Sequence, residues 1–222
     1  MRRAVVAVAP ALILALTLLL TACASAPLRS VAVNADAESA WQVRQAALTA
    51  VSAWTLAGRI AAHNGDGIGS AGGTGADGAA TVNISATLHW AQQASGYTID
   101  VIAPFGQGAI RLEGNSDGVM LRLADGRQLN AANPDSLLYD HTGLHLPITS
   151  LRFWVLGVPD PTSEARKAID DTGRTLWLEQ SGWRIEFLRY SQVNGLDLPG
   201  KLVITNPPMH MRLVIDRWEL SL

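Results

Sequence analysis

The chain has very little cysteine and few charges. Only one of its 222 residues is a cysteine, and 16% are charged, with 17 Lys and Arg against 19 Asp and Glu. One thiol is too few for a disulfide scaffold or a cysteine-rich metal centre. Nucleic-acid binding needs clustered positive charge. A chain of net charge −2 without a basic cluster is therefore a poor candidate for it.

Motifs of common enzyme classes are also scarce. The G-x-x-x-x-G-K-[ST] loop that cradles nucleotide phosphates is missing. Residues 67–72, GIGSAG, match a dinucleotide fingerprint in letters, but they lie in a Gly-rich stretch that opens no helix. No Ser, His and Asp set stands out from ordinary polar residues. We expect no enzyme and no cofactor; an esterase built from residues distant in sequence stays open.

Metal ligands form only weak patterns. His141 and His145 have helical spacing, but Gly143 lies between them and no carboxylate completes a set. Met209 and Met211 flank His210, yet on a strand the methionines face one way and the histidine the other. We expect no metal site, and we expect these methionines in the core or in the lining of a cavity.

The first 23 residues have the anatomy of a secretory signal. Arg2 and Arg3 precede an apolar run, which ends in the letters LTAC at Cys23. These letters resemble the bacterial lipoprotein box, in which the cysteine becomes the first residue of the mature protein and carries acyl chains. Ala24 then implies the outer membrane. We expect a signal peptide over 1–22 and an acylated Cys23 with a flexible tether over 23–38. An uncleaved membrane anchor is the alternative.

Residues 39–222 are expected to form a single domain of α+β class. Alternating apolar residues predict strands through most of the chain after residue 80, with a hairpin turn at Asp125-Gly126. Three helical segments are expected. They cover roughly 39–52, with Ser39 as N-cap; 133–143, capped by Asn133; and 149–157, capped by Thr149 or Ser150. Residues 65–80 read as a Gly-rich insert between two strands.

One turn is unexpectedly apolar. Residues 104–108 read PFGQG between two strand-like flanks, so Phe105 occupies a position that normally faces water. The ring either projects from the turn or folds back onto the core. The chain also holds seven Trp against three Tyr and three Phe. These Trp residues fit either a solid core or the lining of a cavity for a lipid-like ligand.

An ordered series of motifs carries a family resemblance. The series comprises AWTLAGRIA, LHW, APFGQGAIRLEG, LADGR, LLYDHTGLHLPITSLRFWVLGVP, GWRIEFLRY, LPGKLVI and RLVIDRWELSL. In this order they resemble the LolB family over residues 41–222. The resemblance implies an incomplete antiparallel β-barrel of about 11 strands, with a helical lid over an apolar cavity.

The resemblance also implies a function. The family consists of outer-membrane receptors that take lipoproteins from a periplasmic LolA-like carrier, hold their acyl chains and insert them into the inner leaflet. Family members project an apolar residue from a loop, which here matches Phe105 between Pro104 and Gly106, with Phe in place of Leu. The partners implied are the carrier, acylated clients and membrane lipid, and we expect a monomer. The alternatives are a lipoprotein that binds another amphiphile, a phospholipid or a glycolipid, and a scaffold without a ligand.

Strand alternation selects residues for the cavity lining within this implied fold. They are Ile99, Val101, Ile110, Leu112, Leu121 and Trp154. A shift of one residue in strand register would invert the assignment.

Overall fold

A computed structural model describes residues 35–64, 83–106, 108–142 and 145–221. These residues belong to one compact unit. The predicted signal peptide, Cys23, the Gly-rich insert at 65–80 and the GIGSAG stretch lie outside the described ranges. Among the described helices, each is too short or too polar to cross a bilayer.

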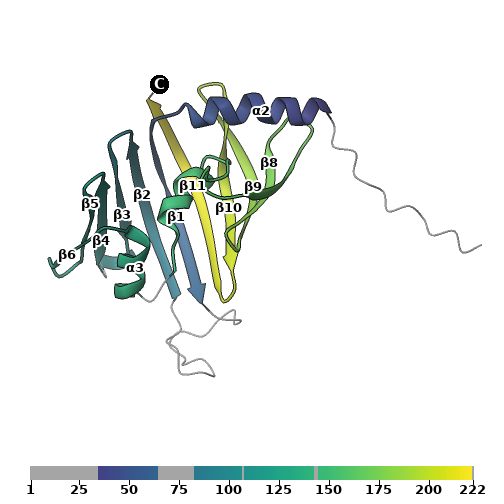
Figure 1. Ribbon diagram of the computed structural model, residues 1–222. Coiled ribbons are helices and arrows are strands. Elements are labelled where there is room, and N and C mark those ends of the chain that lie inside the picture. Colours follow the sequence, from purple (N-terminus) through teal and green to yellow (C-terminus); the bar gives the residue numbers. More distant parts are fainter. Residues whose placement is uncertain (1–34, 65–82, 107, 143–144, 222) are drawn as a thin grey trace, which may run out of the picture. The chain divides into compact units, whose positions relative to one another are not determined.

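The described chain contains eleven strands and three α-helices (Figure 1). The helices are α2 (Ala35–Thr49), α3 (Pro134–Thr142) and α4 (Ile148–Trp154). The strands are β1 (Ala53–Asn64), β2 (Asn83–Gln93), β3 (Gly96–Ile102), β4 (Ala109–Asn115), β5 (Gly118–Arg122), β6 (Gln128–Ala131), β7 (Ala165–Ile169), β8 (Thr175–Gln180), β9 (Trp183–Val193), β10 (Leu196–Asn206) and β11 (Met209–Ser221). A short 3-10 turn, η1 (Pro104–Gly106), joins β3 to β4.

All eleven strands form one antiparallel sheet in the order β6-β5-β4-β3-β2-β1-β11-β10-β9-β8-β7. The pairing of β1 with β11 joins the two halves, and β6 and β7 remain as edges, so the sheet is an incomplete barrel. Strands β1, β3, β5, β8 and β10 run in one direction because every neighbouring pair is antiparallel. The C-terminal ends of these five strands therefore lie at one end of the sheet, which we call the Phe105 end because the turn after β3 holds Phe105. The expected class, α+β with an incomplete barrel, is confirmed.

Local sequence explains most element boundaries. Asn133 caps α3, because its Oδ1 accepts hydrogen bonds from the backbone N–H groups of Asp135 at 2.8 Å and Ser136 at 3.2 Å. The loop at Asp125-Gly126 is the predicted hairpin turn, with Gly126 at a φ of 87°. Helix α4 ends before Gly157, whose φ of 86° only glycine adopts at low cost. The predicted terminator of α3, Gly143, lies outside the described residues.

Two predicted caps are wrong. Ser39 lies inside α2, which begins at Ala35, and its hydroxyl donates to the Ala35 carbonyl at 2.9 Å. Thr149 and Ser150 lie inside α4, whose N-cap position is held by Pro147. Both hydroxyls instead bind aspartates elsewhere in the fold. The Thr149 and Ser150 hydroxyls therefore bind tertiary partners and do not cap the helix.

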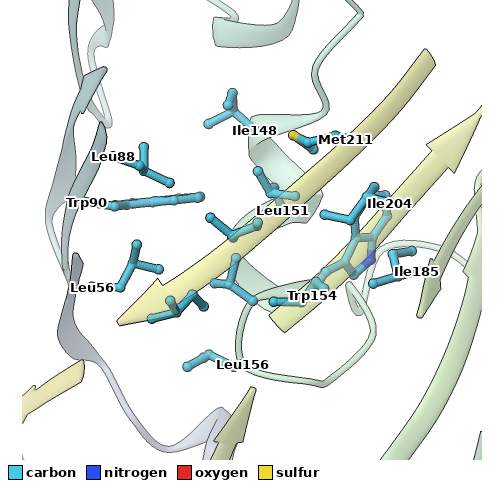
Figure 2. Packing of buried hydrophobic residues seen from close by; sticks show 14 of the residues in the cluster. Leu56, Leu88, Trp90, Ile148, Leu151, Trp154, Leu156, Ile185, Ile204 and Met211 are labelled. Carbon is cyan, nitrogen blue, oxygen red and sulfur yellow. The ribbon is translucent and has the colours of Figure 1, made fainter. Parts of the chain in front are cut away.

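Helix α4 lies inside the curve of the sheet. Figure 2 shows Leu151 and Trp154 of this helix between Leu56 and Trp90 on one side and the strands of the C-terminal half on the other. Helix α3 packs against α4 and against β5 and β6. Helix α2 runs along the end of the sheet opposite the Phe105 end (Figure 1). The two helices α3 and α4 thus form the lid that the fold class requires.

Candidate functional site

The turn between β3 and β4 presents Phe105 to solvent. The side chain is 98% exposed, and the residue has a φ of 56° and a ψ of 26°. A hydrogen bond of 2.9 Å from the Ala103 N–H to the Gly108 carbonyl closes the base of the turn. Pro104 and Gly106 flank the ring on either side. The ring projects from the turn, so the alternative in which it folds back onto the core is wrong.

This conformation is unfavourable for an isolated molecule. A left-handed backbone costs a bulky residue about 1–2 kcal/mol, and the exposed ring gains nothing from the core. Nearby Ile102 is also 41% exposed. An apolar side chain held outward at such a cost fits a surface that meets an apolar partner.

Five of the six residues predicted to line the cavity lie in two neighbouring rows on the inner face of β3, β4 and β5. Ile99, Leu112 and Leu121 form one row across β3, β4 and β5, and each is at most 5% exposed. Val101 and Ile110 pair in the next row and are partly buried. Trp154 is fully buried on α4, where its ring packs against Trp183 of the C-terminal half of the sheet. These side chains pack against one another, so the inner face is filled by the apolar side of α4.

A buried polar cluster holds α4 to the sheet. The Oε1 of Gln180, at the end of β8, accepts the Trp154 indole N–H at 2.8 Å and the Asp160 backbone N–H at 2.9 Å. Its Nε2 donates to the carbonyls of Asp160 at 2.7 Å and Ser163 at 2.8 Å. The Asp160 carboxylate in turn accepts the Ser150 hydroxyl of α4 at 2.7 Å. We call Gln180, Asp160 and Ser150, with the Trp154 indole, the α4 latch.

Helices α3 and α4 are also tied to each other. The Asp135 carboxylate accepts a hydrogen bond from the Thr149 hydroxyl at 2.8 Å. Because Asp135 lies in the first turn of α3 and Thr149 in the first turn of α4, this bond joins their N-terminal turns. A displacement of α4 without α3 would therefore have to break this bond.

The latch is expected to depend on pH. Burial acts to raise the pKa of the Asp160 carboxyl, but hydrogen bonds from Ser150 and Thr162 outweigh it and hold that pKa below its ordinary value. When folding lowers the pKa of a carboxyl group, its charged form stabilises the folded state. This contribution is complete above about pH 4 and is lost as the pH falls through the pKa of the folded state. We expect denaturant titrations to show this loss in the wild type and a shallower loss in Asp160→Asn. If the wild type and Asp160→Asn lost stability in parallel as the pH falls, the assignment of this loss to the Asp160 carboxyl would be wrong.

The inner faces of β2 and β3 carry polar atoms with no hydrogen-bond partner among the described residues. They are the Trp90 Nε1, the Gln92 Oε1 and the Tyr97 hydroxyl, and Gln92 lies directly opposite Tyr97. Burial raises the pKa of Tyr97 to about 12. Unpaired polar groups in an otherwise apolar interior mark a place where the fold is not optimised for stability alone.

Tyr97→Phe tests this interpretation. Removing a buried hydroxyl that has no partner should leave the free energy of unfolding unchanged or raise it by up to about 1 kcal/mol. Tyr190→Phe is the matched control, because the Tyr190 hydroxyl donates to the Thr175 carbonyl at 2.7 Å. The control should lose about 1 kcal/mol. Urea denaturation measures both free energies of unfolding. Equal losses in Tyr97→Phe and Tyr190→Phe would show that the Tyr97 hydroxyl has a hydrogen-bond partner.

The catalytic and metal motifs find no support in the described residues. Three or more potential ligands do not gather anywhere in these ranges. His145 stacks on Tyr139, with ring centroids 3.9 Å apart, and Met209 and Met211 are buried. Residues 114–118, GNSDG, match the letters of a G-x-S-x-G nucleophile elbow. They form the hairpin turn between β4 and β5, whereas an elbow joins a strand to a helix.

The half-barrel, its lid and its projecting loop define a class of protein with an apolar interior beneath covering helices. Solved structures share this fold. A LolA superfamily protein from Nitrosomonas europaea matches with a TM-score of 0.51 at 7% identity, over 83% of this chain and 93% of its own. A DUF1329 family protein from Desulfovibrio piger matches with a TM-score of 0.53 at 6% identity, over 84% and 94%.

Sequence comparison then fixes the family. The model of the outer membrane lipoprotein LolB family matches residues 52–218. An outer-membrane lipoprotein LolB from Nitrosococcus oceani is 35% identical over 88% of this chain and 90% of its own. Its counterpart from Pseudomonas syringae pv. syringae is 31% identical over 94% of each. The chain belongs to the LolB family.

Proposed function

We propose that this protein receives lipoproteins from a LolA-like periplasmic carrier, covers their acyl chains in its interior and inserts them into the inner leaflet of the outer membrane. One observation carries the proposal: a ring that is 98% exposed projects from the same half-barrel whose interior is apolar and covered by a lid. Family membership and the printed names of the relatives, outer-membrane lipoprotein LolB, support it.

The energetics require a covered path. Three acyl chains hold on the order of 40 methylenes, and exposing them to water costs roughly 0.8 kcal/mol each, or tens of kcal/mol together. The interior made by Ile99, Leu112, Leu121 and their neighbours is the apolar environment available to them. Because α4 fills this interior, the chains enter as α4 and α3 move outward and the α4 latch opens.

Phe105 acts at the membrane in this proposal. Burying its ring in lipid is worth about 2–3 kcal/mol. This is too little to anchor the protein, a role that we assign to acylated Cys23 on the periplasmic face of the outer membrane. It is enough to orient the Phe105 end of the sheet toward the bilayer. Pro104 and Gly106 flank Phe105 in the 3-10 turn that presents the ring.

A transfer assay tests the proposal. The full mature chain is reconstituted in liposomes, and a LolA-like carrier loaded with a radiolabelled triacylated lipoprotein is added. We expect the label to move to the liposomes faster than with protein-free liposomes. Label that stays on the carrier while the protein is folded would overturn the proposal. Uptake of free phospholipid without uptake of lipoprotein would instead establish a receptor for another amphiphile.

A further inference from the structure

A cavity of about 590 Å³ opens between the lid and the ends of the C-terminal strands. On the lid side it is lined by Tyr139 and Asp140 of α3 and by Pro147, just before α4. On the sheet side it is lined by Trp183 and Asn206. Trp183 follows the β8–β9 turn and Asn206 ends β10, so this wall belongs to the Phe105 end of the sheet.

Trp183 separates this cavity from the interior. Its ring packs against that of Trp154, with centroids 6.2 Å apart and planes tilted by 48°. Trp154 is fully buried beneath the lid, while Trp183 is 6% exposed and reaches the cavity. The preceding turn at Ser181-Gly182, with φ values of 51° and 80°, directs the chain into β9 at this point. The Trp183 ring is thus in contact with both spaces.

We propose that this cavity is the portal through which acyl chains pass into and out of the interior, and that Trp183 is the side chain that they displace. The inference rests on the proposed function and locates the entrance to the interior that this function requires. Chains that leave at the Phe105 end emerge where the exposed ring meets the bilayer, so they pass from protein to lipid without crossing water. The lid side of the portal is formed by the helices that must move.

Two other cavities are less suitable. One of about 490 Å³ also reaches Trp183, but its walls carry the ion pairs of Glu179 with Arg166 at 2.6 Å and with Arg184 at 2.7 Å. Four charged side chains line that cavity and two, Asp135 and Asp140, line the proposed portal, so an acyl chain would strip water from more charged groups there. Another, of about 170 Å³, is lined by Ser52 and Ala94. These residues lie at the opposite end of the sheet, where released chains would meet water.

Cross-linking tests the portal. The double variant Asp140→Cys/Asn206→Cys places thiols on its two sides, and a bismaleimide that contains a reducible disulfide bridges them. The matched control is Ser52→Cys/Ala94→Cys, bridged across the 170 Å³ cavity. Mass spectrometry identifies the intramolecular bridges and excludes any that involve Cys23. The measurement is the rate at which the full chain takes up a fluorescent triacylated lipopeptide.

We expect the portal bridge to slow uptake at least tenfold relative to the same variant carrying two monofunctional maleimides. Reductive cleavage should restore the rate, which a folding defect would not allow. The control bridge should leave uptake unchanged. If the portal bridge leaves the rate of uptake unchanged, or if only the control bridge blocks uptake, the proposal that this cavity is the portal is overturned. Failure of all unbridged forms to take up the lipopeptide would instead count against the proposed function.

Discussion

Phe105→Glu is expected to reduce delivery of lipoproteins to membranes by about 30- to 100-fold while the protein folds normally. The ring is 98% exposed, so its removal takes no contact from the core. The variant loses about 2–3 kcal/mol of ring burial in the bilayer, and each 1.4 kcal/mol corresponds to a factor of ten. The carboxylate adds a desolvation cost of its own. Uptake from the carrier, which does not require the bilayer contact, should persist.

The measurement separates uptake from delivery. Label is followed first onto the protein and then into liposomes, and the free energy of unfolding is measured in urea. Phe105→Leu keeps an apolar side chain and should retain most delivery. Val43→Glu is the matched control, because Val43 is 74% exposed on α2, away from the Phe105 end. A Phe105→Glu variant that delivers at the wild-type rate would remove the membrane role from this loop.

Gln180→Leu is expected to lower the free energy of unfolding by about 3–5 kcal/mol. The substitution removes four hydrogen bonds, three of them buried, and leaves the Trp154 indole N–H and the Asp160 backbone N–H without an acceptor. Each unsatisfied buried donor costs about 1–3 kcal/mol. Because the lost bonds attach Trp154 of α4 and the segment that follows this helix to β8, the lid should also open more often, and an apolar dye should bind more strongly than to the wild type.

The matched control for Gln180→Leu is Gln192→Leu, because Gln192 is exposed on β9. This control should change the free energy of unfolding by less than about 0.5 kcal/mol. Urea denaturation and dye fluorescence on the same samples provide both readouts. If Gln180→Leu lost stability without increased dye binding, the latch would be structural only, and the helices would open by another route.

Much of the fold was predictable from short-range patterns. Alternation placed Ile99, Leu112 and Leu121 on one face, and the ladder pairs them in one row, because a side-chain period of two leaves no freedom once one face is buried. The PFGQG turn predicted an apolar side chain in an unusual position. The exposure of the Phe105 ring and its left-handed backbone are not determined by these letters alone.

What could not be predicted depends on contacts between distant segments. Gln180 is 26 residues from Trp154, and no local pattern marks it as the acceptor of that indole. Trp183 was one of seven tryptophans with nothing to distinguish it, since its position depends on how the β8–β9 turn meets the lid. The letters of strand β7, ARKAI, carry too few apolar residues to show the alternation that predicts a strand.

The open edges at β6 and β7 have a mechanical consequence. In a closed barrel, the strand number and the stagger between strands fix the circumference, and with it the enclosed volume. A sheet that ends in two edges has no such constraint, so its curvature can relax without breaking any ladder hydrogen bond. The volume under the lid is then not fixed by strand number and stagger, and bending of the sheet is a way to change it.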